Sequence, residues 1–587
     1  MLSNSLEYGL IILYTNSMNN VTFLKRLTAV ARGAMPADLV IKNSKIVDLF
    51  NGRIIRADAA IYKDTIAGIG KYNGKKIIDA KGCYLLPGFI DGHVHLESTM
   101  LSPVEFAKTT IAHGTTAVII DPHEIANVAG IAGIKYILNA TENLPIDFYI
   151  MAPSCVPASN LETYGHRITA SDIKKFLKSK RVTGLAEVMD FSDVVSGRED
   201  IIKKIAAARD KIIDGHAPLL SGKSLSAYIA AGPSSDHEAT NINEGREKLS
   251  LGMHLMIREG SIAKDLKSLI KLVNKHSLSN ISFVSDDLLP TELIRDGHIN
   301  RILKKAVKLG LDPIVAIRMA TLNTARYFNL KRIGAVAPGY KADTVLVKDL
   351  EGFKIHTVIK DGKVVYEDGK YRISPDRKLL PPFNIINSVK ARPVDERDLS
   401  AKTKERIDVI GLIPNEILTK WLRLKPKIKN GMVVSDTQKD ILKIAVVDRH
   451  KASGNIGCGF VKGIGLKRGA IAASIAHDSH NIISVGENDK DMAVAINRII
   501  AMQGGLVIVE DGRALGELPL PIAGLMSDKS AKSVEGSLDK LEMITKRLGV
   551  KTEHPFTTLS FLSLPVIPEL RVTDLGVVDV MKGRIVS

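Results

Sequence analysis

The middle of the chain, residues 86–330, alternates short apolar runs with amphipathic stretches. Stretches such as SPVEFAKTTIAHG, REDIIKKIAAARD and AKDLKSLIKLVNKH place apolar residues at i, i+3, i+4 and i+7, a spacing that predicts helices. The runs between them predict eight strands, of which the sixth has the fewest apolar residues: 89–97, 116–124, 147–155, 182–189, 212–218, 234–240, 254–261 and 281–287. Eight strand–helix units in about 240 residues are typical of a (β/α)8, TIM-type barrel.

The two segments that flank this barrel share a β-rich pattern. Residues 31–85 and 331–385 contain short, alternating, β-branched runs separated by turn residues. The pair Asp361-Gly362 lies between two apolar runs, which predicts a hairpin. We therefore expect both segments to form one small β-sandwich domain, with the barrel inserted in it.

The two ends of the chain are less regular. Residues 386–587 mix strand-like runs, such as KIAVVDR and GLVIVED, with helical ones. This mixture predicts a C-terminal α/β or α+β domain and leaves its topology open. Residues 1–30 are interpreted as an N-terminal tail, and Met18 offers an alternative start that would place residues 1–17 upstream of the protein.

The composition of the 587 residues is that of a globular protein with a basic balance. Lys plus Arg number 81 against 64 Asp plus Glu, a net charge of +17. This charge invites a nucleic-acid or membrane partner. No Lys/Arg run exceeds three residues, and aromatic residues make up only 5% of the chain, so a basic, aromatic-bearing binding face is not indicated. We expect solvated surface charge, with no nucleic-acid and no membrane partner.

The cysteine and apolar content predicts a cytoplasmic protein. Three cysteines cannot form a disulfide framework in a chain of this length, and none lies in a CxxC pair. No apolar run approaches the ~18 to 20 residues of a membrane span. The N-terminal apolar run lacks the features of a signal peptide.

Polar residues end almost every predicted barrel strand, which is where a barrel carries its active site. In strand order they are His93 and His95, then Asp121, His123 and Glu124, Ser154 and Cys155, Glu187, His216, then Asp236, His237 and Glu238, Arg258 and Glu259, and Asp286 and Asp287. Alternate residues of a strand share one face, so the two imidazoles of His-Val-His can reach the same ion. Several imidazoles with two or three carboxylates favour two adjacent divalent ions over one.

Each of these residues also has a purely structural interpretation. A single histidine such as His216 is more often a hydrogen-bonded structural residue than a ligand. Six such groups at the ends of separate strands favour a metal centre over that interpretation. In the C-terminal part, the histidine-rich IAHDSHNI segment with His477 and His480 is either a turn cluster or a lid over the barrel mouth. The glycine-rich SGNIGCGFVKG lacks the strand and helix of a dinucleotide site.

At this point the motifs match a known family. PGFIDGHVHLEST and the AHGTT segment resemble the amidohydrolase superfamily. DPHEIANVAG, MAPSCVPA, GLAEVMD, DGHAPLLSG, SSDHEAT, MIREGS, FVSDD and MATLNTARYFNL resemble its adenine deaminase family, as do GNIGCGFVKG and IAHDSHNI in the C-terminal third. The resemblance spans nearly all of the chain from about residue 30.

The resemblance implies a binuclear metal site and names its ligands. The positions that match the superfamily pattern are His93, His95, His216, His237 and Asp286. Many relatives bridge their metals with a carboxylated lysine, and Glu187 stands at that place here, as in adenine deaminases. The family is associated with two divalent ions, manganese or iron; the residues themselves do not exclude zinc.

The resemblance also implies the reaction, hydrolysis of adenine to hypoxanthine and ammonia in purine salvage. We expect a homo-oligomer, a dimer. The mechanism we expect is attack on C6 by a hydroxide held between the metals, with Asp286 as general base and His237 holding the nucleophile. The nearest candidates for purine contacts are Ser98, His123, Glu124 and Asp287. The alternative is another amidohydrolase that acts on a different aminopurine or a cyclic amide.

Overall fold

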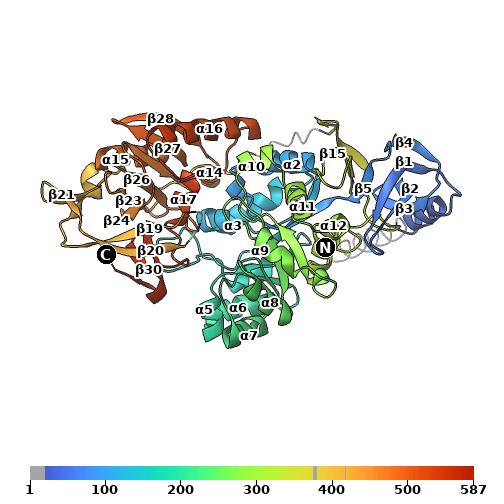
Figure 1. Cartoon of the computed structure of the whole chain (residues 1–587), viewed down its shortest axis with the longest axis horizontal. Coiled ribbons are helices and arrows are strands. Elements are labelled where there is room, and N and C mark those ends of the chain that lie inside the picture. Colours follow the sequence, from blue (N-terminus) through green and yellow to red (C-terminus); the bar gives the residue numbers. More distant parts are fainter. Residues whose placement is uncertain (1–19, 374–379, 415, 417, 587) are drawn as a thin grey trace, which may run out of the picture.

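The computed structural model describes residues 20–373, 380–414, 416 and 418–586, and its centre is a parallel β-barrel with surrounding helices (Figure 1). Its eight strands coincide with the predicted runs: β6 (Phe89–Val94), β7 (Thr115–Ile120), β8 (Asp147–Ala152), β9 (Val182–Val188), β10 (Ile212–Gly215), β11 (Ser235–Asp236), β12 (His254–Arg258) and β13 (Ile281–Val284). Nearly every residue of these strands is buried, as expected where helices cover a parallel sheet. The predicted (β/α)8 fold class is confirmed.

The barrel closes through two irregular seams. Strands β6 to β10 form one parallel sheet and β11 to β13 another. One seam is a bridge between Val94 and Asp286, and at the other the Ser234 N–H donates to the Ile213 carbonyl at 2.9 Å. The sixth strand, predicted on few apolar residues, is only two residues long. Its Asp236 side chain accepts bonds from the backbone N–H groups of Ala217, Glu238 and Ala239, which explains a buried aspartate there.

Two of the three quoted helical stretches form the helices expected of them, α2 (Pro103–Ala112) and α6 (Glu199–Ala207). The third, AKDLKSLIKLVNKH, forms only α9 (Leu266–Leu269) and a short 3-10 turn. There the Asn274 side chain accepts bonds from the N–H groups of His276 and Ser277, at 2.9 and 3.3 Å. Such local side-chain bonds compete with the helix, so the apolar spacing overestimated its length.

Both flanking segments contribute to one nine-stranded sheet beside the barrel (Figure 1). Strand β5 (Tyr84–Pro87) of the first segment pairs antiparallel with β14 (Thr344–Val347) of the second. The predicted hairpin joins β15 (Ile355–Lys360) and β16 (Lys363–Glu367). Asp361 and Gly362 have φ angles of 51° and 71°, as a type I′ turn requires.

The remaining strands of this sheet come from the first segment: β1 (Ala37–Asp48), β2 (Arg53–Tyr62), β3 (Thr65–Gly70) and β4 (Gly74–Asp79); β17 (Lys370–Tyr371) ends the other edge. Residues 20–31 are helical, and their Leu27 and Val30 pack against Val40 and Tyr62. This part of the predicted N-terminal tail therefore belongs to the β domain, because its apolar side chains have a core to enter. Residues 1–19, including Met18, lie outside the described residues.

The C-terminal part is built on a mostly antiparallel eight-stranded sheet, ordered β20-β19-β24-β23-β26-β25-β27-β28. These strands are β19 (Ile407–Leu412), β20 (Thr419–Leu424), β23 (Ile441–Val447), β24 (Ile456–Lys462), β25 (Ala470–Ala473), β26 (Ile482–Gly486), β27 (Gly505–Glu510) and β28 (Arg513–Pro519). Helix α15 (Asp489–Ala501) covers its centre, and α16 (Ala531–Arg547) and α17 (Pro555–Phe561) lie towards the barrel (Figure 1). Of the two predicted classes, the arrangement is α+β.

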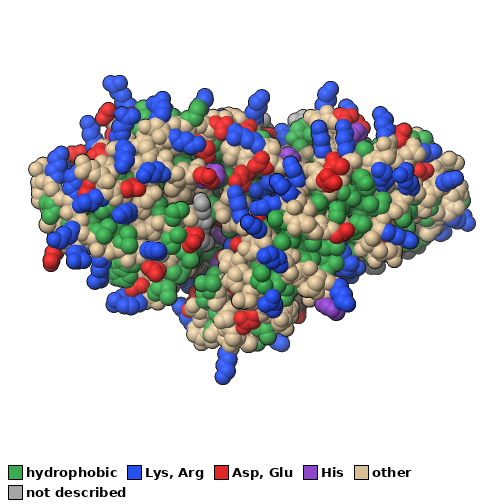
Figure 2. Space-filling view, viewed as in Figure 1, with side chains coloured by type: hydrophobic (Ala, Val, Ile, Leu, Met, Phe, Trp, Pro, Cys, Tyr) green, Lys and Arg blue, Asp and Glu red, His purple; other side chains and the backbone are tan. Residues whose placement is uncertain are grey.

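The surface carries its charge in a dispersed form. Figure 2 shows Lys and Arg side chains scattered over all three parts of the visible face, with Asp and Glu side chains among them. In the part of the chain that the structure describes, we find no helix with the length and apolar character needed to cross a membrane.

Candidate metal centre

Six buried or nearly buried side chains from different strands converge at the mouth of the barrel: His93, His95, Glu187, His216, His237 and Asp286. His93 is the fifth residue of β6 and His95 directly follows that strand, while Glu187 is the sixth residue of β9. The other three follow the C-terminal ends of β10, β11 and β13. The sequence predicted all six as metal ligands, and the barrel brings them together because parallel strands end at one rim.

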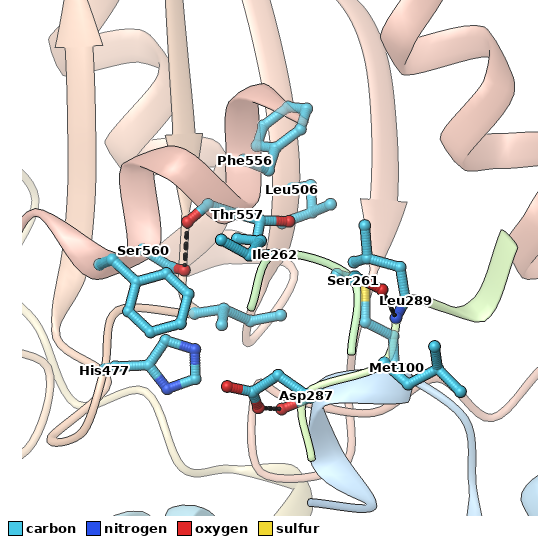
Figure 3. A pocket seen from close by; sticks show the side chains of 14 residues that line it. Met100, Ser261, Ile262, Asp287, Leu289, His477, Leu506, Phe556, Thr557 and Ser560 are labelled. Atoms are coloured by element: carbon cyan, nitrogen blue, oxygen red, sulfur yellow. Dashed lines mark hydrogen bonds between the residues drawn. The ribbon is translucent and has the colours of Figure 1, made fainter. Parts of the chain in front are cut away.

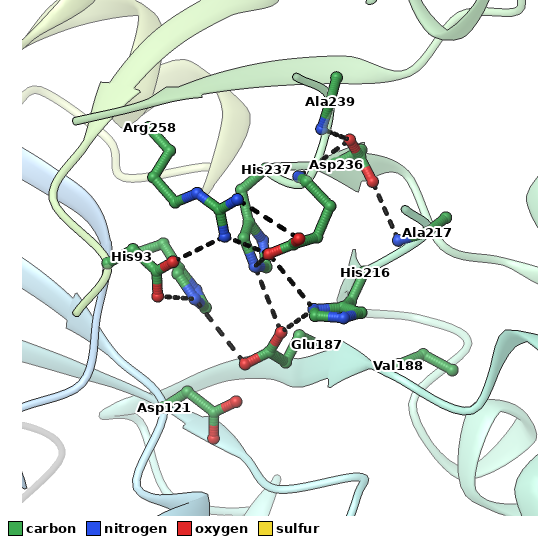
Figure 4. A network of polar contacts seen from close by, with 12 residues as sticks. His93, Asp121, Glu187, Val188, His216, Ala217, Asp236, His237, Ala239 and Arg258 are labelled. Atoms are coloured by element: carbon green, nitrogen blue, oxygen red, sulfur yellow. Dashed lines mark hydrogen bonds and ion pairs between the residues drawn. The ribbon is translucent and has the colours of Figure 1, made fainter. Parts of the chain in front are cut away.

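Glu187 occupies the middle of this group. One carboxylate oxygen, Oε1, lies 3.4 Å from His95 Nε2 and 3.8 Å from His93 Nε2. The other, Oε2, lies 2.8 Å from His216 Nδ1 and 3.3 Å from His237 Nε2. Figure 4 shows this carboxylate between His93 on one side and His216 on the other. Its two oxygens therefore face two different pairs of imidazoles.

Asp286 completes the first pair. Its Oδ1 atom lies 3.2 Å from His95 Nε2 and 3.6 Å from His93 Nε2. The residue has a positive φ of 56°, which is uncommon for a non-glycine residue outside turns and functional sites. The donor set thus divides into two adjacent positions that share Glu187.

The donor chemistry of this group fits divalent cations. His93 Nε2 is buried and has no hydrogen-bond partner among the described residues, although its ring faces two carboxylates. Burial alone would lower the pKa of His95, but Asp286 and Glu187 raise it well above its usual range. For Glu187, burial would raise the pKa, but hydrogen bonds from His216 and His237 lower it well below. Imidazoles that gather around ionised carboxylates in this way are suited to exchange their protons for a metal ion.

Arg258 adds a cation to the other side of Asp286. Its Nη1 atom donates to Asp286 Oδ2 at 3.0 Å and to Glu238, and its Nε atom donates to Asp265 at 3.3 Å. Burial raises the pKa of Asp286, whereas His93, His95 and Arg258 lower it, and the net shift is well below the usual range. The sequence analysis placed Arg258 and Glu238 at strand ends but gave them no role. Their position at the ends of barrel strands was the one feature of the sequence that pointed to the site.

His123, predicted as a purine contact, lies directly beside the metal-ligand candidates. Its Nδ1 atom is 3.0 Å from Asp121 Oδ2 and 3.6 Å from Glu187 Oε1. Asp121 therefore fixes the ring beside the metal-ligand candidates. Cys155 contacts the same imidazole, and burial raises the pKa of its thiol to about 11, so the thiolate needed for a nucleophile is disfavoured.

The other predicted purine contacts lie together at the rim. Ser98 Oγ donates to Asp287 Oδ1 at 2.5 Å and lies 3.3 Å from Glu124 Oε1. Glu124 Oε1 is also 3.1 Å from Nδ1 of His477, which belongs to the C-terminal domain. The sequence left the histidine-rich segment around His477 as either a turn cluster or a lid over the barrel mouth, and its contact with Glu124 lies at that mouth. We call Ser98, Glu124, Asp287 and His477 the junction cluster.

A cavity connects these groups. Its volume is about 610 Å³, and its walls include His95, Glu187 and Asp286 from the barrel and His477, Phe561 and Leu564 from the C-terminal domain. A second, mostly apolar cavity of about 440 Å³ adjoins it (Figure 3). Seven of the predicted site residues line the first cavity: His95, His123, Glu124, Glu187, His216, Asp286 and Asp287. Ser98 lines the second, and His93 and His237 contact Glu187 and are not among the lining residues of either.

Comparison with known proteins relates both halves of the chain to one kind of enzyme. Residues 84–365 match the amidohydrolase family, and residues 416–584 match the adenine deaminase C-terminal domain. An adenine deaminase of Kosmotoga olearia is 50% identical over 95% of this chain and 97% of its own length. An adenine deaminase 2 of Carboxydothermus hydrogenoformans is 48% identical over 96% of this chain and 99% of its own. This chain belongs to the adenine deaminase family of amidohydrolases.

Proposed function

We propose that this protein hydrolyses adenine to hypoxanthine and ammonia. The observation that carries the proposal is the position of Glu187 between two pairs of imidazoles, in a cavity walled by both the barrel and the C-terminal domain. The adenine deaminases named above are similar to this chain over nearly its whole length, and they indicate adenine as the substrate.

Two divalent ions fit the donor set. His93, His95 and Asp286 would hold one, His216 and His237 the other, and Glu187 would contact both. When bound, such ions supply water that is already acidic enough to ionise near neutral pH. Manganese and iron suit a set of imidazoles and carboxylates, and zinc remains an alternative.

Asp286 and His237 have different roles in the reaction. Asp286 is held as a carboxylate, since Arg258 binds Oδ2 while Oδ1 faces the imidazoles. It is therefore the general base: it takes one proton from the attacking water and passes it to the purine ring nitrogen. The proton left on the C6 hydroxyl is then passed to the amine, which departs as ammonia when the C6–N bond breaks. His237, close to both Glu187 and Glu238, positions the water near C6.

The junction cluster supplies donors and acceptors for the purine edge. Ser98, Glu124 and Asp287 are linked by hydrogen bonds, so their orientations are set before a ligand binds. His123 lines the same cavity as Glu124, Asp287 and Glu187. A polar rim with fixed orientation favours a substrate with several ring nitrogens over an apolar one.

Three further features belong to this proposal as predictions: a role in purine salvage, a homodimeric state and a cytoplasmic location. None of them follows from the site geometry.

A substrate panel tests the proposed function. Protein loaded with manganese or with iron is assayed for ammonia release from adenine, adenosine, guanine and cytosine, with metal counted per chain. We expect turnover of adenine and about two metals per chain. Release of ammonia from a different aminopurine, or opening of a cyclic amide, without adenine turnover would establish the alternative activity. No turnover of adenine in any loaded form would overturn the proposal.

A further inference from the structure

A segment of the C-terminal domain enters the mouth of the barrel. His477 lies in the connection between β25 and β26, and its side chain is buried. Its backbone N–H donates to the Ser560 carbonyl at 3.0 Å, and its carbonyl accepts from Ser563 Oγ at 3.3 Å. Helix α17 and the residues after it therefore fix the position of this histidine.

The imidazole of His477 is held on one face and at one nitrogen. Its ring stacks on Phe561, with centroids 4.6 Å apart and an interplanar angle of 21°. Its Nδ1 atom lies 3.1 Å from Glu124 Oε1. Among the residues that the structure describes, nothing forms a hydrogen bond with its Nε2 atom. This second nitrogen is a donor that the protein itself leaves unused.

His477 stands where the two cavities meet. Four residues line both cavities: Ile262, Asp287, His477 and Phe561. Figure 3 shows the imidazole beside Asp287 at one end of the apolar cavity. Four of the metal-ligand candidates line the other cavity: His95, Glu187, His216 and Asp286. A purine whose C6 faces those ligands would extend to this boundary. According to its orientation it presents there N3, across the ring from C6, or N7, on the five-membered ring.

The charge of His477 favours donation. Burial would lower the pKa of the imidazole, but Glu124, Asp287 and Asp478 raise it to about 9. The ring is therefore an imidazolium at neutral pH, and both of its nitrogens are donors. A charged donor makes a stronger hydrogen bond to a neutral acceptor than an uncharged one does.

A third metal site at this place is the less favourable interpretation. Glu124, His477 and His480 do bring ligand atoms within 4.8 Å of one another. However, the Ala476 N–H donates to His480 Nδ1 at 3.3 Å, so the proton of a neutral His480 resides on Nε2. That nitrogen then has no lone pair for a metal, and the cluster is better suited to hydrogen bonding.

We propose that His477 is a specificity-determining residue of this deaminase, whose Nε2–H donates to an unprotonated ring nitrogen of the purine, N3 or N7. The C-terminal domain thereby takes part in substrate recognition. This inference rests on the proposed function, because it assumes that adenine is the substrate. It assigns no proton transfer and no metal to His477.

The test compares His477→Ala and His477→Gln with the intact protein. For each we measure kcat and KM for adenine, and the inhibition constants of 3-deazaadenine and 7-deazaadenine, which each lack one acceptor nitrogen. His276→Asn, an exposed histidine remote from the cavities, is the matched control. Metal content and thermal unfolding are recorded for all variants.

We expect His477→Ala to lower kcat/KM by about 10- to 100-fold, the size of a hydrogen bond to a charged group. The intact protein should bind one deaza analogue much more weakly than the other, and His477→Ala should lose that preference. His477→Gln, which retains a neutral donor, should retain part of it. His276→Asn should match the intact protein.

Three results would overturn the inference while leaving adenine turnover by the intact protein in place. One is a kcat/KM for His477→Ala within about twofold of the intact protein; a second is an unchanged preference between the two analogues. The third is a loss of bound metal in His477→Ala, which would make His477 a ligand. If the intact protein itself fails to deaminate adenine, the proposed function falls instead.

Discussion

The ring of metal-ligand candidates and the junction cluster lie side by side but are assembled in different ways. Every member of the ring comes from the end of a barrel strand, so the barrel alone brings it together. The junction cluster joins Ser98, Glu124 and Asp287 to His477, which is nearly 200 residues further along the chain than Asp287. The ring therefore depends on one domain, and the cluster depends on how two domains dock.

The contact between the domains includes an apolar core that they share and polar contacts outside the cavity. Arg295 at the end of α10 (Pro290–Arg295) forms ion pairs with Glu535 at 2.7 Å and Asp539 at 2.5 Å, both on α16. The Ala531 N–H at the start of α16 donates to Glu105 of α2 at 2.9 Å. We infer that chemistry and selectivity are separable in this enzyme. Variants that change one group at a time test that separation.

The largest effect is expected from Glu187→Gln. The amide cannot carry the charge that balances two cations, so we expect loss of most bound metal and a fall in kcat of more than about 10⁴-fold. Elemental analysis and ammonia release measure the two quantities. Retention of two metals per chain with activity within tenfold of the intact protein would show that Glu187 is not shared between the two positions.

Among the metal-ligand candidates, Asp286→Asn should separate metal binding from proton transfer. Asparagine keeps an oxygen that can face His93 and His95, so most of the metal should remain. The base is lost, so kcat should fall by about 10²- to 10⁴-fold. Asp210→Asn, at an exposed position, is the control. Near-native turnover by Asp286→Asn would show that another group is the base.

Glu124→Gln addresses the junction cluster and should have a smaller effect. It removes the charge that faces His477 and weakens an acceptor for Ser98, so we expect kcat/KM to fall about tenfold, mainly through KM. Metal content should stay unchanged, in contrast to Glu187→Gln. Glu405→Gln, at an exposed position, serves as the control. If Glu124→Gln loses metal, the ring and the cluster are not separable.

The smallest effect is expected on the stability of the fold at acid pH, which depends on one buried histidine in the barrel and one in the C-terminal domain. Burial lowers the pKa of His254 in the barrel to about 3 and that of His450 in the C-terminal domain to about 3. Unfolding restores a pKa near 6.5. The unfolded chain thus binds more protons between these values, and stability is lost as pH falls from about 6.5 towards 3.

Replacing either histidine by glutamine should flatten this dependence by one proton, about 1.4 kcal/mol per pH unit. Denaturant unfolding followed between pH 7 and pH 4 measures the slope. If the two domains unfold as one unit, both variants should change the same transition. Two separate transitions, each sensitive to only one variant, would show that the domain contact adds little to cooperativity.

Sequence reasoning anticipated the barrel and its rim because both follow from local patterns. Period and strand length located β6 to β13, and the rule that barrel sites lie at strand ends placed His93, Glu187 and Asp286 together. The shape of the C-terminal sheet did not follow, since antiparallel strand order depends on pairings between distant segments.

Two features of the site needed three-dimensional information. Arg258 ends a predicted strand, but only the structure shows that its guanidinium binds the second oxygen of Asp286. The IAHDSHNI segment is conspicuous for its histidines, yet its sequence does not indicate that His477 reaches Glu124. The ligand roles stay predictions that the variants above address, and the proposed domain limits stay predictions.

The pairing of β5 with β14 also bears on how the protein is made. Thr344 leaves the ribosome about 250 residues after Pro87, which at ~5–20 residues per second takes on the order of ten to fifty seconds. During this delay the edge of β5 that pairs with β14 has no partner strand, whereas its other edge can already pair with β1. Leu85 and Leu86 of this strand are apolar. Because the chain is made from its N-terminus, this edge of β5 stays unpaired until the whole barrel has been translated. An unpaired strand edge can pair with another chain, so the nascent protein is exposed to aggregation at this stage.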